Sequence, residues 1–533
     1  MTASRTLPRR RGNRLSRIPM LLVAIAASIV LQSCAPNVVA ETGPPRPTGS
    51  QETDLGPQIQ EKMRNIQKLM PEWLKAGGDA SRVDRLLKEF EELAKSGKLA
   101  EASKKLDEVL ALLEPSRARE DGTKTVEKPE TPPRGPEGES RSSSTRYLLF
   151  QIFSGGPNPQ TGLFMSESSK GHYEKIIRDI KRDINPQRSP DRRLGFSIGP
   201  VTMDQSDQEL GQLIRDVFEL AEKNDMAVAI HLDSSMFWKN ARGKDGKKLV
   251  DNPKNIEMKD WKGTPSDGSK ISWLPNVPLA PQMCFNSTDI KAAVARFATE
   301  VIGREVRKGI DRLKVQGKED LFAGVIAGWE TDMADGYCAL RNNGYSATNP
   351  PADLEREKEK IVQAYIARWA KGLRDAGIDK NLIYTHTAHI PKKTYEFLKS
   401  RFPPDELRRK FNSTSFKAVW VAFNEYANPG FSGYPAEGLF EDFYGELAKH
   451  GNPPWAMAEG SNVMLSEGGA SKGSFMDWET YLGKLFNHGA RLVNIFGGWQ
   501  GESAGPFRQA TESGQALAAY RKFLRGEQLK EAR

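Results

Sequence analysis

Two glutamates stand at the ends of short apolar runs, and together they could break a glycosidic bond. The first run, Phe322–Asp332, reads Phe-Ala-Gly-Val-Ile-Ala-Gly-Trp-Glu-Thr-Asp and reaches its first acid at Glu330. The second run, Trp455–Ser461, reads Trp-Ala-Met-Ala-Glu-Gly-Ser and carries Glu459. Glycosidases use a pair of carboxyl groups in this way, one as the acid and the other as the nucleophile or base.

The neighbours of the two glutamates suit this chemistry. Trp329 precedes Glu330, and Ala458 precedes Glu459. A carboxyl group withdrawn from water has a raised pKa and holds a proton at neutral pH, and a second carboxylate nearby acts in the same direction. A separation of ~5–5.5 Å between the two carboxyl groups would predict retention at the anomeric carbon, and one of ~6.5–9.5 Å would predict inversion.

The chain from residue 146 onward alternates apolar runs with amphipathic helical patterns, which predicts a (β/α)8 TIM barrel. The expected strands are 146–154, 194–199, 226–233, 322–330, 382–387, 416–423, 454–459 and 491–497. The expected helices are 171–184, 207–224, 288–314, 353–376, 393–401, 437–450, 475–488 and 511–525. The long connections, above all 234–287 and 331–352, run from strand to helix. All such connections lie at the C-terminal face of a barrel, where the two glutamates would meet.

Polar side chains at other strand ends would face the same mouth. We expect Asp233 after the third strand, His386 in the fifth and Tyr426 after the sixth to contact the substrate. Asp332 and Glu425 are rivals for the acid roles, because a strand end misplaced by two residues would exchange them with the two glutamates.

The positions of the two acids are similar to those of clan A retaining glycoside hydrolases, which include the β-galactosidase-like families. These enzymes carry the acid/base at the end of strand four and the nucleophile at the end of strand seven. The resemblance implies these roles for Glu330 and Glu459 respectively. It also implies that Trp499, just after strand eight, lies under the sugar in the −1 subsite.

One position departs from the pattern of that clan. Its members usually place Asn before the strand-four glutamate to hold the 2-hydroxyl group of the sugar, whereas this chain has Trp329. We expect Trp329 to line the substrate site. Asn462 is the expected substitute for the missing amide, with Asn424 and Asn494 as alternatives.

Aromatic residues gather in the long loops. Trp238, Trp261 and Trp273 follow the third strand, and Tyr337 follows the fourth. Flat rings suit the apolar faces of sugars, and they equally pack a loop onto a barrel. Trp238 is the one that we expect to bind substrate.

The first residues of the chain predict export. Residues 1–33 contain six arginines and no acids, and 18–31 are apolar but shorter than the ~20 residues of a membrane span. Leu31–Cys34 reads Leu-Gln-Ser-Cys and resembles a bacterial lipobox, which implies lipidation at Cys34 and anchoring to the membrane of the cell envelope. An ordinary signal peptide cut nearby is the alternative.

Four segments follow this signal. Residues 34–55 form a flexible tether rich in Pro, Gly and Thr, and 56–114 carry helical patterns that predict a hairpin. Residues 115–144 contain almost nothing apolar and predict a disordered linker, and the barrel occupies 145–533. The hairpin is interpreted as a spacer, or as a site of self-association.

Charge and cysteine usage exclude some functions. The formal net charge is +9, of which the six arginines of the signal supply two thirds, so we expect no nucleic-acid partner. Cys284 and Cys338 are too few for a zinc knuckle, and a disulfide between them and two free thiols both remain open. The strands lack the His-x-His of metal-dependent barrels, so no metal or cofactor is expected.

The sequence therefore predicts a lipid-anchored glycoside hydrolase of the cell envelope, acting on a polysaccharide or oligosaccharide through Glu330 and Glu459. One alternative is a non-catalytic glycan-binding lipoprotein on a degenerate barrel, in which the loop tryptophans matter more than either glutamate. Another is a structural envelope protein whose working part is the hairpin.

Overall fold

The computed structural model describes residues 145–530 except 168, 187–188, 268–276, 402–417, 467–468, 498 and 500–510, together with parts of 58–113. The chain divides into two compact units. One unit contains the N-terminal helices, and the other comprises Glu139–Ser466 and Ala470–Arg533.

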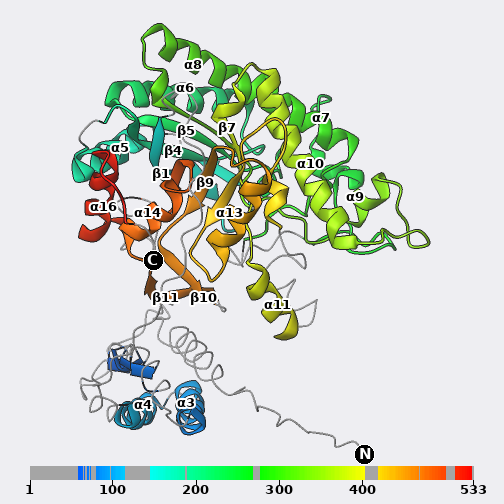
Figure 1. Cartoon of the computed structure of the whole chain (residues 1–533). Helices are drawn as coiled ribbons and strands as arrows, with labels where there is room; N and C mark the ends of the chain where they lie inside the picture. The colour runs from blue at the N-terminus through cyan, green and yellow to red at the C-terminus, as the bar shows by residue number, and fades with distance from the viewer. Residues whose placement is uncertain are drawn as a thin grey trace, which may run out of the picture. The chain divides into compact units, whose positions relative to one another are not determined.

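Eight parallel strands form a barrel in the larger unit (Figure 1). Around the barrel they are β7 (Ile383–Thr385), β6 (Phe322–Ala327), β5 (Ala227–Leu232), β4 (Arg192–Val201), β1 (Arg146–Phe153), β12 (Ala490–Ile495), β9 (Trp455–Gly460) and β8 (Gly430–Gly433). Backbone hydrogen bonds close the barrel between β7 and β8: Thr385 N–H donates to Asn428 O (3.0 Å), and Ser432 N–H donates to Thr387 O (2.9 Å). The predicted (β/α)8 TIM barrel is confirmed.

Helices follow the strands and lie outside them (Figure 1). In chain order they are α5 (Lys170–Ile184), α6 (Asp207–Asn224), α7 (Thr288–Arg296), the π-helical η4 (Phe297–Gly303), α8 (Arg304–Val315), α9 (Tyr337–Asn342), α10 (Leu354–Asp375), α11 (Lys392–Arg401), α13 (Leu439–Lys449), α14 (Trp478–Phe486) and α16 (Gly514–Leu524). Ser and Asp side chains cap several starts, and at α6 Ser206 and Glu209 form a capping box. These bounds agree with the eight predicted helical stretches to within a few residues.

The sixth strand differs from the prediction. The predicted strand 416–423 is replaced in its described part by a 3-10 turn, η7 (Val419–Ala422), whose backbone accepts hydrogen bonds from Gln363 of α10. The barrel strand is instead β8, which begins at Gly430. A Cβ at Gly430 would lie 2.1 Å from the Thr385 carbonyl oxygen, so this strand passes too close to β7 for a side chain there.

The barrel interior has two layers of inward side chains. The lower layer is apolar and contains Tyr147, Leu149, Ala227, Ala229, Ala323, Ile326, Tyr384, Ala456, Ala458 and Leu492. The upper layer, nearer the carboxyl ends of the strands, is buried and polar, and we call it the polar layer: Gln151, Ser197, His231, His386, Ser432 and Asn494. Since side chains alternate along a strand, His231 follows Ala229 and His386 follows Tyr384 on the inner face.

Smaller elements decorate the barrel. Two short two-stranded sheets lie after β1 and β9: β2 (Gly155–Pro157) antiparallel to β3 (Phe164–Ser166), and β10 (Val463–Ser466) with β11 (Gly469–Phe475). The long connection after β5 contains the 3-10 turns η2 (Leu249–Asp251) and η3 (Pro253–Asn255), and η5 (Glu319–Leu321) and η6 (Lys380–Leu382) precede β6 and β7. Buried Glu257 ties the first connection to α9 by accepting hydrogen bonds from the N–H groups of Cys338 and Ala339.

The N-terminal unit contains two helices with complete bounds, α3 (Ala80–Lys95) and α4 (Leu99–Leu113). They pack around an apolar core that includes Val83, Phe90 and Leu106. The amphipathic spacing of both helices leaves their opposite faces charged, as in the predicted hairpin.

Candidate active site

Glu330 lies just after β6, in a backbone conformation that is rare for a residue with a side chain. Its φ is +48°, and Gly328 two residues earlier has φ +110°. A Cβ at Gly328 would lie 2.9 Å from Thr331 Oγ1, so the turn requires glycine there. Ser432 Oγ donates a hydrogen bond to Glu330 Oε1 at 2.5 Å. Strain of this kind is characteristic of functional sites, where the surrounding packing must hold it in place.

Glu459 is near the end of β9 and is brought opposite Ser432 by an irregularity in the ladder. Phe431 of β8 pairs with Met457, but the next residue, Ser432, pairs with Glu459, so Ala458 is the extra residue of a bulge. Paired residues on neighbouring strands point to the same face, and Ser432 points inward. The bulge therefore turns Glu459 into the barrel mouth on the side of Ser432 that faces β9.

The surroundings of Glu459 favour its protonated form. The side chain is buried, and Tyr434 Oη donates to Glu459 Oε1 at 2.7 Å. Burial raises the pKa of Glu459 well above its ordinary value, and the charge of Glu330 raises it further, while hydrogen bonds from Tyr434 and Trp329 lower it in part. Burial together with Glu459 and Glu330 also raises the pKa of Tyr434, so its hydroxyl remains a donor.

A chain of hydrogen bonds runs from Glu330 into the polar layer. His386 Nε2 lies 2.9 Å from Ser432 Oγ, which donates to Glu330. His386 Nδ1 lies 3.0 Å from His231 Nε2, and His231 Nδ1 lies 2.9 Å from Gln151 Oε1. Glu330 is thus connected through three buried side chains to an amide on the far side of the barrel.

Trp329, which precedes Glu330, contacts His231 of the polar layer and also acts on Glu459. Its ring stacks on the imidazole of His231, with centroids 4.1 Å apart and planes 3° apart. A Cβ at Gly199 would lie 3.1 Å from the Trp329 ring, so the glycine leaves the room that the indole fills. Trp329 also lowers the pKa of Glu459, so its indole lies close to that carboxyl group, as a residue lining the substrate site would.

Several residues of the site were not predicted. Ser432 lies within β8, a strand that the sequence prediction had placed elsewhere, Tyr434 directly follows it, and Gln151 lies within β1. Phe496, after β12, packs its ring edge against Tyr434 with centroids 6.4 Å apart. The alternation Ser432-Gly433-Tyr434 was the available signal, since positions two apart on a strand share a face.

Two residues that were predicted to contact substrate, His386 and Asp233, form hydrogen bonds within the protein instead. His386 is fully buried behind Ser432, with both ring nitrogens in the hydrogen-bond chain. Asp233 is buried, and its carboxylate accepts hydrogen bonds from the N–H groups of Ser235, Met236 and Phe237. Burial raises the pKa of Asp233 to about 6. Asp233 thus shapes the turn after β5.

The structure contradicts the expected substrate contacts of two tryptophans. Trp238 is fully buried, and its indole N–H donates to Pro281 O at 3.0 Å, so it packs the insertion onto the barrel. Trp499 is also buried, donates to Asp183 Oδ2 at 3.2 Å and packs edge-on against Phe150. Phe150 points outward from β1 into the layer between strands and helices, so Trp499 does not lie under the mouth.

Asn462 follows β9 at the mouth end of the barrel and is buried. Its Nδ2 donates to Met476 O at 2.7 Å, its Oδ1 has no hydrogen-bond partner among the described residues, and its contact with substrate stays a prediction. Tyr426 lies elsewhere than expected. Tyr426 precedes β8 by four residues, and its pKa responds to Glu425, Lys371 and Asp375 at the end of α10. It is therefore at the N-terminal end of the barrel, opposite to the mouth, and the expected substrate contact is wrong.

The alternative residues are placed as follows. Glu425 shares the N-terminal end with Tyr426 and is exposed. Asp332 accepts a hydrogen bond from the N–H of Met333 at 2.7 Å. Trp261 and Tyr337 pack against each other edge-on at 5.0 Å, and Trp273 lies outside the described residues.

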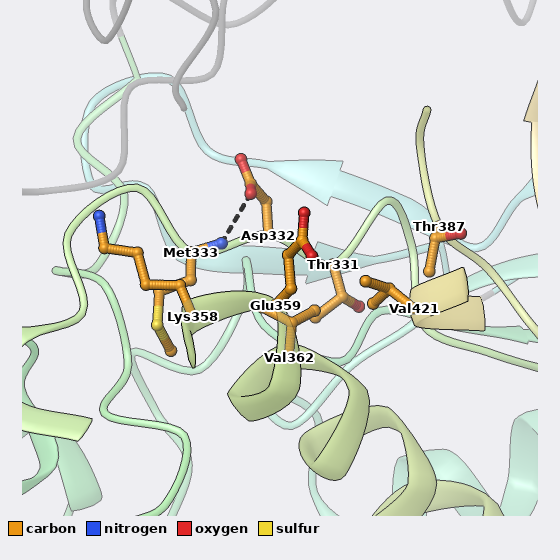
Figure 2. A pocket seen from close by; sticks show the side chains of 8 residues that line it. All are labelled: Thr331, Asp332, Met333, Lys358, Glu359, Val362, Thr387 and Val421. Atoms are coloured by element: carbon orange, nitrogen blue, oxygen red, sulfur yellow. Dashed lines mark hydrogen bonds between the residues drawn. The ribbon is translucent and has the colours of Figure 1, made fainter. Parts of the chain in front are cut away.

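A small pocket lies next to the Glu330 turn (Figure 2). Its side chains come from the loop after β6, from α10, and from beyond β7 and η7: Thr331, Asp332, Met333, Lys358, Glu359, Val362, Thr387 and Val421. Neither catalytic candidate lines it, so this pocket is separate from the space between the two glutamates.

The described residues contain neither a metal-binding cluster nor a membrane-spanning helix. In these ranges no three His, Cys, Asp or Glu side chains are grouped so that they could hold a metal ion. Within the same part of the chain, the helices are all too short or too polar to cross a membrane. Cys34 lies outside the described residues, and its lipidation stays a prediction.

No family model and no curated protein matches this chain. Among solved structures, a Bacteroidetes-affiliated GH5 cellulase is 11% identical over 73% of this chain and 97% of its own, with a TM-score of 0.33. A β-amylase catalytic domain from Paenibacillus polymyxa is 10% identical over 72% of this chain and 99% of its own, with a TM-score of 0.36. A D-psicose 3-epimerase is 10% identical over 72% of this chain and 100% of its own, with a TM-score of 0.31. Such distant similarity says nothing about the reaction.

Proposed function

We propose that the barrel is a glycoside hydrolase in which Glu330 and Glu459 form the catalytic pair. The observation that carries the proposal is the position of Ser432, which donates to Glu330 and is paired with Glu459 across β8 and β9. Ser432 thus contacts Glu330 and lies opposite Glu459, so the two carboxyl groups lie at the same part of the barrel mouth. Carboxyl pairs at this face of a TIM barrel are the machinery of glycosidic bond cleavage.

The mechanism that we propose is double displacement with retention. Glu330 gives its proton to the glycosidic oxygen as the bond from that oxygen to the anomeric carbon breaks, and Glu459 forms a covalent bond to the anomeric carbon. Glu330, now a carboxylate, takes a proton from water, and the hydroxide oxygen displaces Glu459. Both carboxyl groups return to their initial states.

The electrostatics of the pair support one shared proton. Burial and the Glu330 charge raise the pKa of Glu459, so the state in which both carboxyl groups are charged is disfavoured. Burial alone would leave the proton on Glu459. Double displacement requires this proton to pass to Glu330, and the Tyr434 hydroxyl then donates to the Glu459 anion, which is the form that a nucleophile needs. We assign the roles from the positions of Glu330 and Glu459 after the fourth and at the end of the seventh barrel strand, β6 and β9.

We further propose that the enzyme acts outside the cytoplasm, anchored through a lipid on Cys34. The lipobox-like Leu31–Cys34 supports this location, and residues 34–144 would then separate the barrel from the membrane. A polymeric or oligomeric glycan of the envelope or surroundings is the substrate class accessible there. Metabolic labelling with a tritiated fatty acid tests the anchor: the wild type should be labelled and Cys34→Ala should not.

The test of the activity is a panel of glycans and aryl glycosides assayed with the wild type, Glu330→Gln and Glu459→Gln. Hydrolysis that falls by at least ~10²-fold in both variants supports the proposal. Hydrolysis that persists unchanged in both variants overturns it. Folding of each variant is checked by circular dichroism.

A non-catalytic glycan-binding barrel is the second candidate. It is favoured by the burial of Glu459, which raises the pKa of this carboxyl group well above its ordinary value and so disfavours the anion that a nucleophile needs. Glycan binding by the wild type without turnover, and unchanged binding in Glu330→Gln and Glu459→Gln, would support this candidate instead.

A further inference from the structure

We propose that Ser432 couples Glu330 to His386, so that these two residues share a single proton, and that His231 and Gln151 are positioning residues that fix the orientation of His386. This inference rests on the proposed function, because it describes how the acid/base residue keeps its proton. We call the five residues Glu330, Ser432, His386, His231 and Gln151 the relay.

The orientation of the relay is set at Gln151. Its Nε2 donates to the backbone carbonyl of Ile152 at 2.9 Å, so its Oε1 must face inward. That oxygen accepts from Asn494 Nδ2 at 3.0 Å and lies 2.9 Å from His231 Nδ1. His231 therefore carries its proton on Nδ1.

The tautomer of His231 in turn fixes which ring nitrogen of His386 carries a proton. Full burial lowers the pKa of His231 well below its ordinary value and His386 lowers it further, while a hydrogen bond with the Gly328 backbone raises it in part, so His231 is neutral. With its one proton on Nδ1, its Nε2 accepts from His386. The nitrogen 3.0 Å away, His386 Nδ1, must then carry a proton. His386 can then gain or lose a proton only at Nε2, which faces Ser432.

Two proton arrangements fit the same atoms. If His386 Nε2 carries a proton, it donates to Ser432, and the Ser432 hydroxyl donates to a Glu330 carboxylate. If His386 Nε2 lacks it, Ser432 donates to His386 and accepts from the Glu330 carboxylic acid. The arrangements differ only by movement of one proton from Glu330 to Ser432 and of another from Ser432 to His386. Neutral His386 therefore favours the acid form of Glu330 that bond cleavage needs.

Other titratable groups around the relay are few. Glu459 and Tyr434 face Glu330 from β9 and from the end of β8, and His231 faces His386 from β5. In the described part of the chain, no lysine or arginine contributes to the pKa shifts of Glu459 or His231. The charges of the relay residues are therefore balanced by one another and by Glu459 and Tyr434.

The test is the pH dependence of kcat/KM in His386→Asn. The asparagine amide can still donate to His231 but has no nitrogen that reaches Ser432. The Ser432 hydroxyl is then free to donate to the Glu330 carboxylate, so we expect the alkaline limb of the profile to move to lower pH by ~1 unit. In a Ser432→Ala background, where the coupling is already broken, His386→Asn should cause no further shift.

The matched control is Thr387→Val, next to His386. Thr387 Oγ1 has no hydrogen-bond partner among the described residues, and valine has nearly the same shape, so this variant should keep the wild-type profile. Identical limbs in His386→Asn and the wild type would overturn the proposal. So would an equal shift with and without Ser432, because that is the result of a purely structural role. If Ser432→Ala does not fold by circular dichroism, Ser432→Cys replaces it.

A second measurement is independent of activity. The carboxylic acid C=O stretch of Glu330 is assigned by infrared spectroscopy as the band absent from Glu330→Gln, and its loss is followed as pH rises. We expect the band to disappear at lower pH in His386→Asn than in the wild type, and an unchanged titration overturns the relay. If the wild type hydrolyses no glycan, the proposed function fails while this titration still decides the relay.

Discussion

Ser432 is paired with Glu459 across β8 and β9, although regular alternation along β9 would place Ala458 there. The bulge at Ala458 is therefore what brings Glu459 to the inner face at the level where Ser432 contacts Glu330. Bulges that redirect a side chain are frequent next to active sites. The two carboxyl groups owe their common position to one extra residue in one strand.

The first prediction separates the roles of the two glutamates. Glu330→Ala should lose ~10²–10⁴-fold in kcat on natural glycans but retain far more activity on aryl glycosides whose leaving group needs no proton. Glu459→Ala should lose activity on both kinds of substrate, because the covalent step is absent. Proton NMR of the first-formed sugar should show the anomeric configuration of the substrate.

Glu425→Gln is the control for both variants, because this exposed residue is at the opposite end of the barrel, and it should behave as the wild type. The reverse pattern, in which Glu459→Ala alone keeps activity on activated substrates, would exchange the two roles. A product of inverted configuration would replace double displacement by direct attack of water.

The second prediction concerns Tyr434, whose hydroxyl donates to Glu459 at 2.7 Å. Hydrogen bonds to charged groups contribute ~1.5–3 kcal/mol, so Tyr434→Phe should lower kcat/KM by ~10–100-fold. The lost donor stabilised the Glu459 anion, so the pKa of Glu459 rises further and the acid limb of the profile moves to higher pH. Tyr444→Phe on α13, which loses a comparable hydrogen bond to Lys484 O far from the mouth, should leave both quantities unchanged.

The barrel was predictable because most of its strands are apolar runs with β-branched or aromatic residues. β8 was not, since Gly-Phe-Ser-Gly has little intrinsic preference for a strand and is selected by its close approach to β7. The apolar run that was predicted in its place, around Trp420, packs against α10 as a turn. Tertiary contacts therefore decided which segment closes the barrel.

The glutamates could be found because an acid ending an apolar run is conspicuous in one sequence. Ser432 and Tyr434 could not, because they belong to the strand that was missed. Trp499 shows a different limit: its place after the eighth strand is as predicted, but sequence does not tell whether a ring points to the mouth or outward to Phe150. Such choices depend on the space that neighbouring side chains leave.

The third prediction is a pH-dependent stability that depends on Glu257. Burial raises the pKa of Glu257 to about 7, although N–H donors from Met258, Cys338 and Ala339 oppose this. Because the folded state binds this proton more tightly than the unfolded state, the contribution to stability is complete below pH ~4.3 and is lost as pH rises through about 7. The free energy of unfolding should therefore fall between pH 5 and pH 8.

Glu257→Gln is neutral at every pH and should show a smaller fall, measured by urea denaturation at the two pH values. The slope should not vanish, since Asp233, with its pKa raised to about 6, acts in the same direction. Exposed Glu300→Gln should keep the wild-type slope. Equal slopes in Glu257→Gln and the wild type would show that Glu257 stays charged throughout.

The fourth prediction is a disulfide between Cys284 and Cys338 when the protein is folded in an oxidising compartment. Both thiols are free and buried in the structure, and Asn342 Nδ2 lies 3.4 Å from the first sulfur and 4.0 Å from the second. Both sulfur atoms thus lie within 4.0 Å of one nitrogen atom, and Cys338 raises the pKa of the Cys284 thiol, so the two thiols are neighbours. Exchange with a disulfide oxidant, which accepts both electrons and protons, would join the insertion after β5 to α9.

Closing the loop between residues 284 and 338 should stabilise the barrel by ~4 kcal/mol on the chain-entropy model. Intact-mass spectrometry of protein exported to the periplasm should show two hydrogens fewer than after reduction, and dithiothreitol should lower the Tm. The double variant Cys284→Ser, Cys338→Ser should show no response to dithiothreitol. Alkylation of both cysteines in unreduced, denatured protein would establish that they remain free thiols.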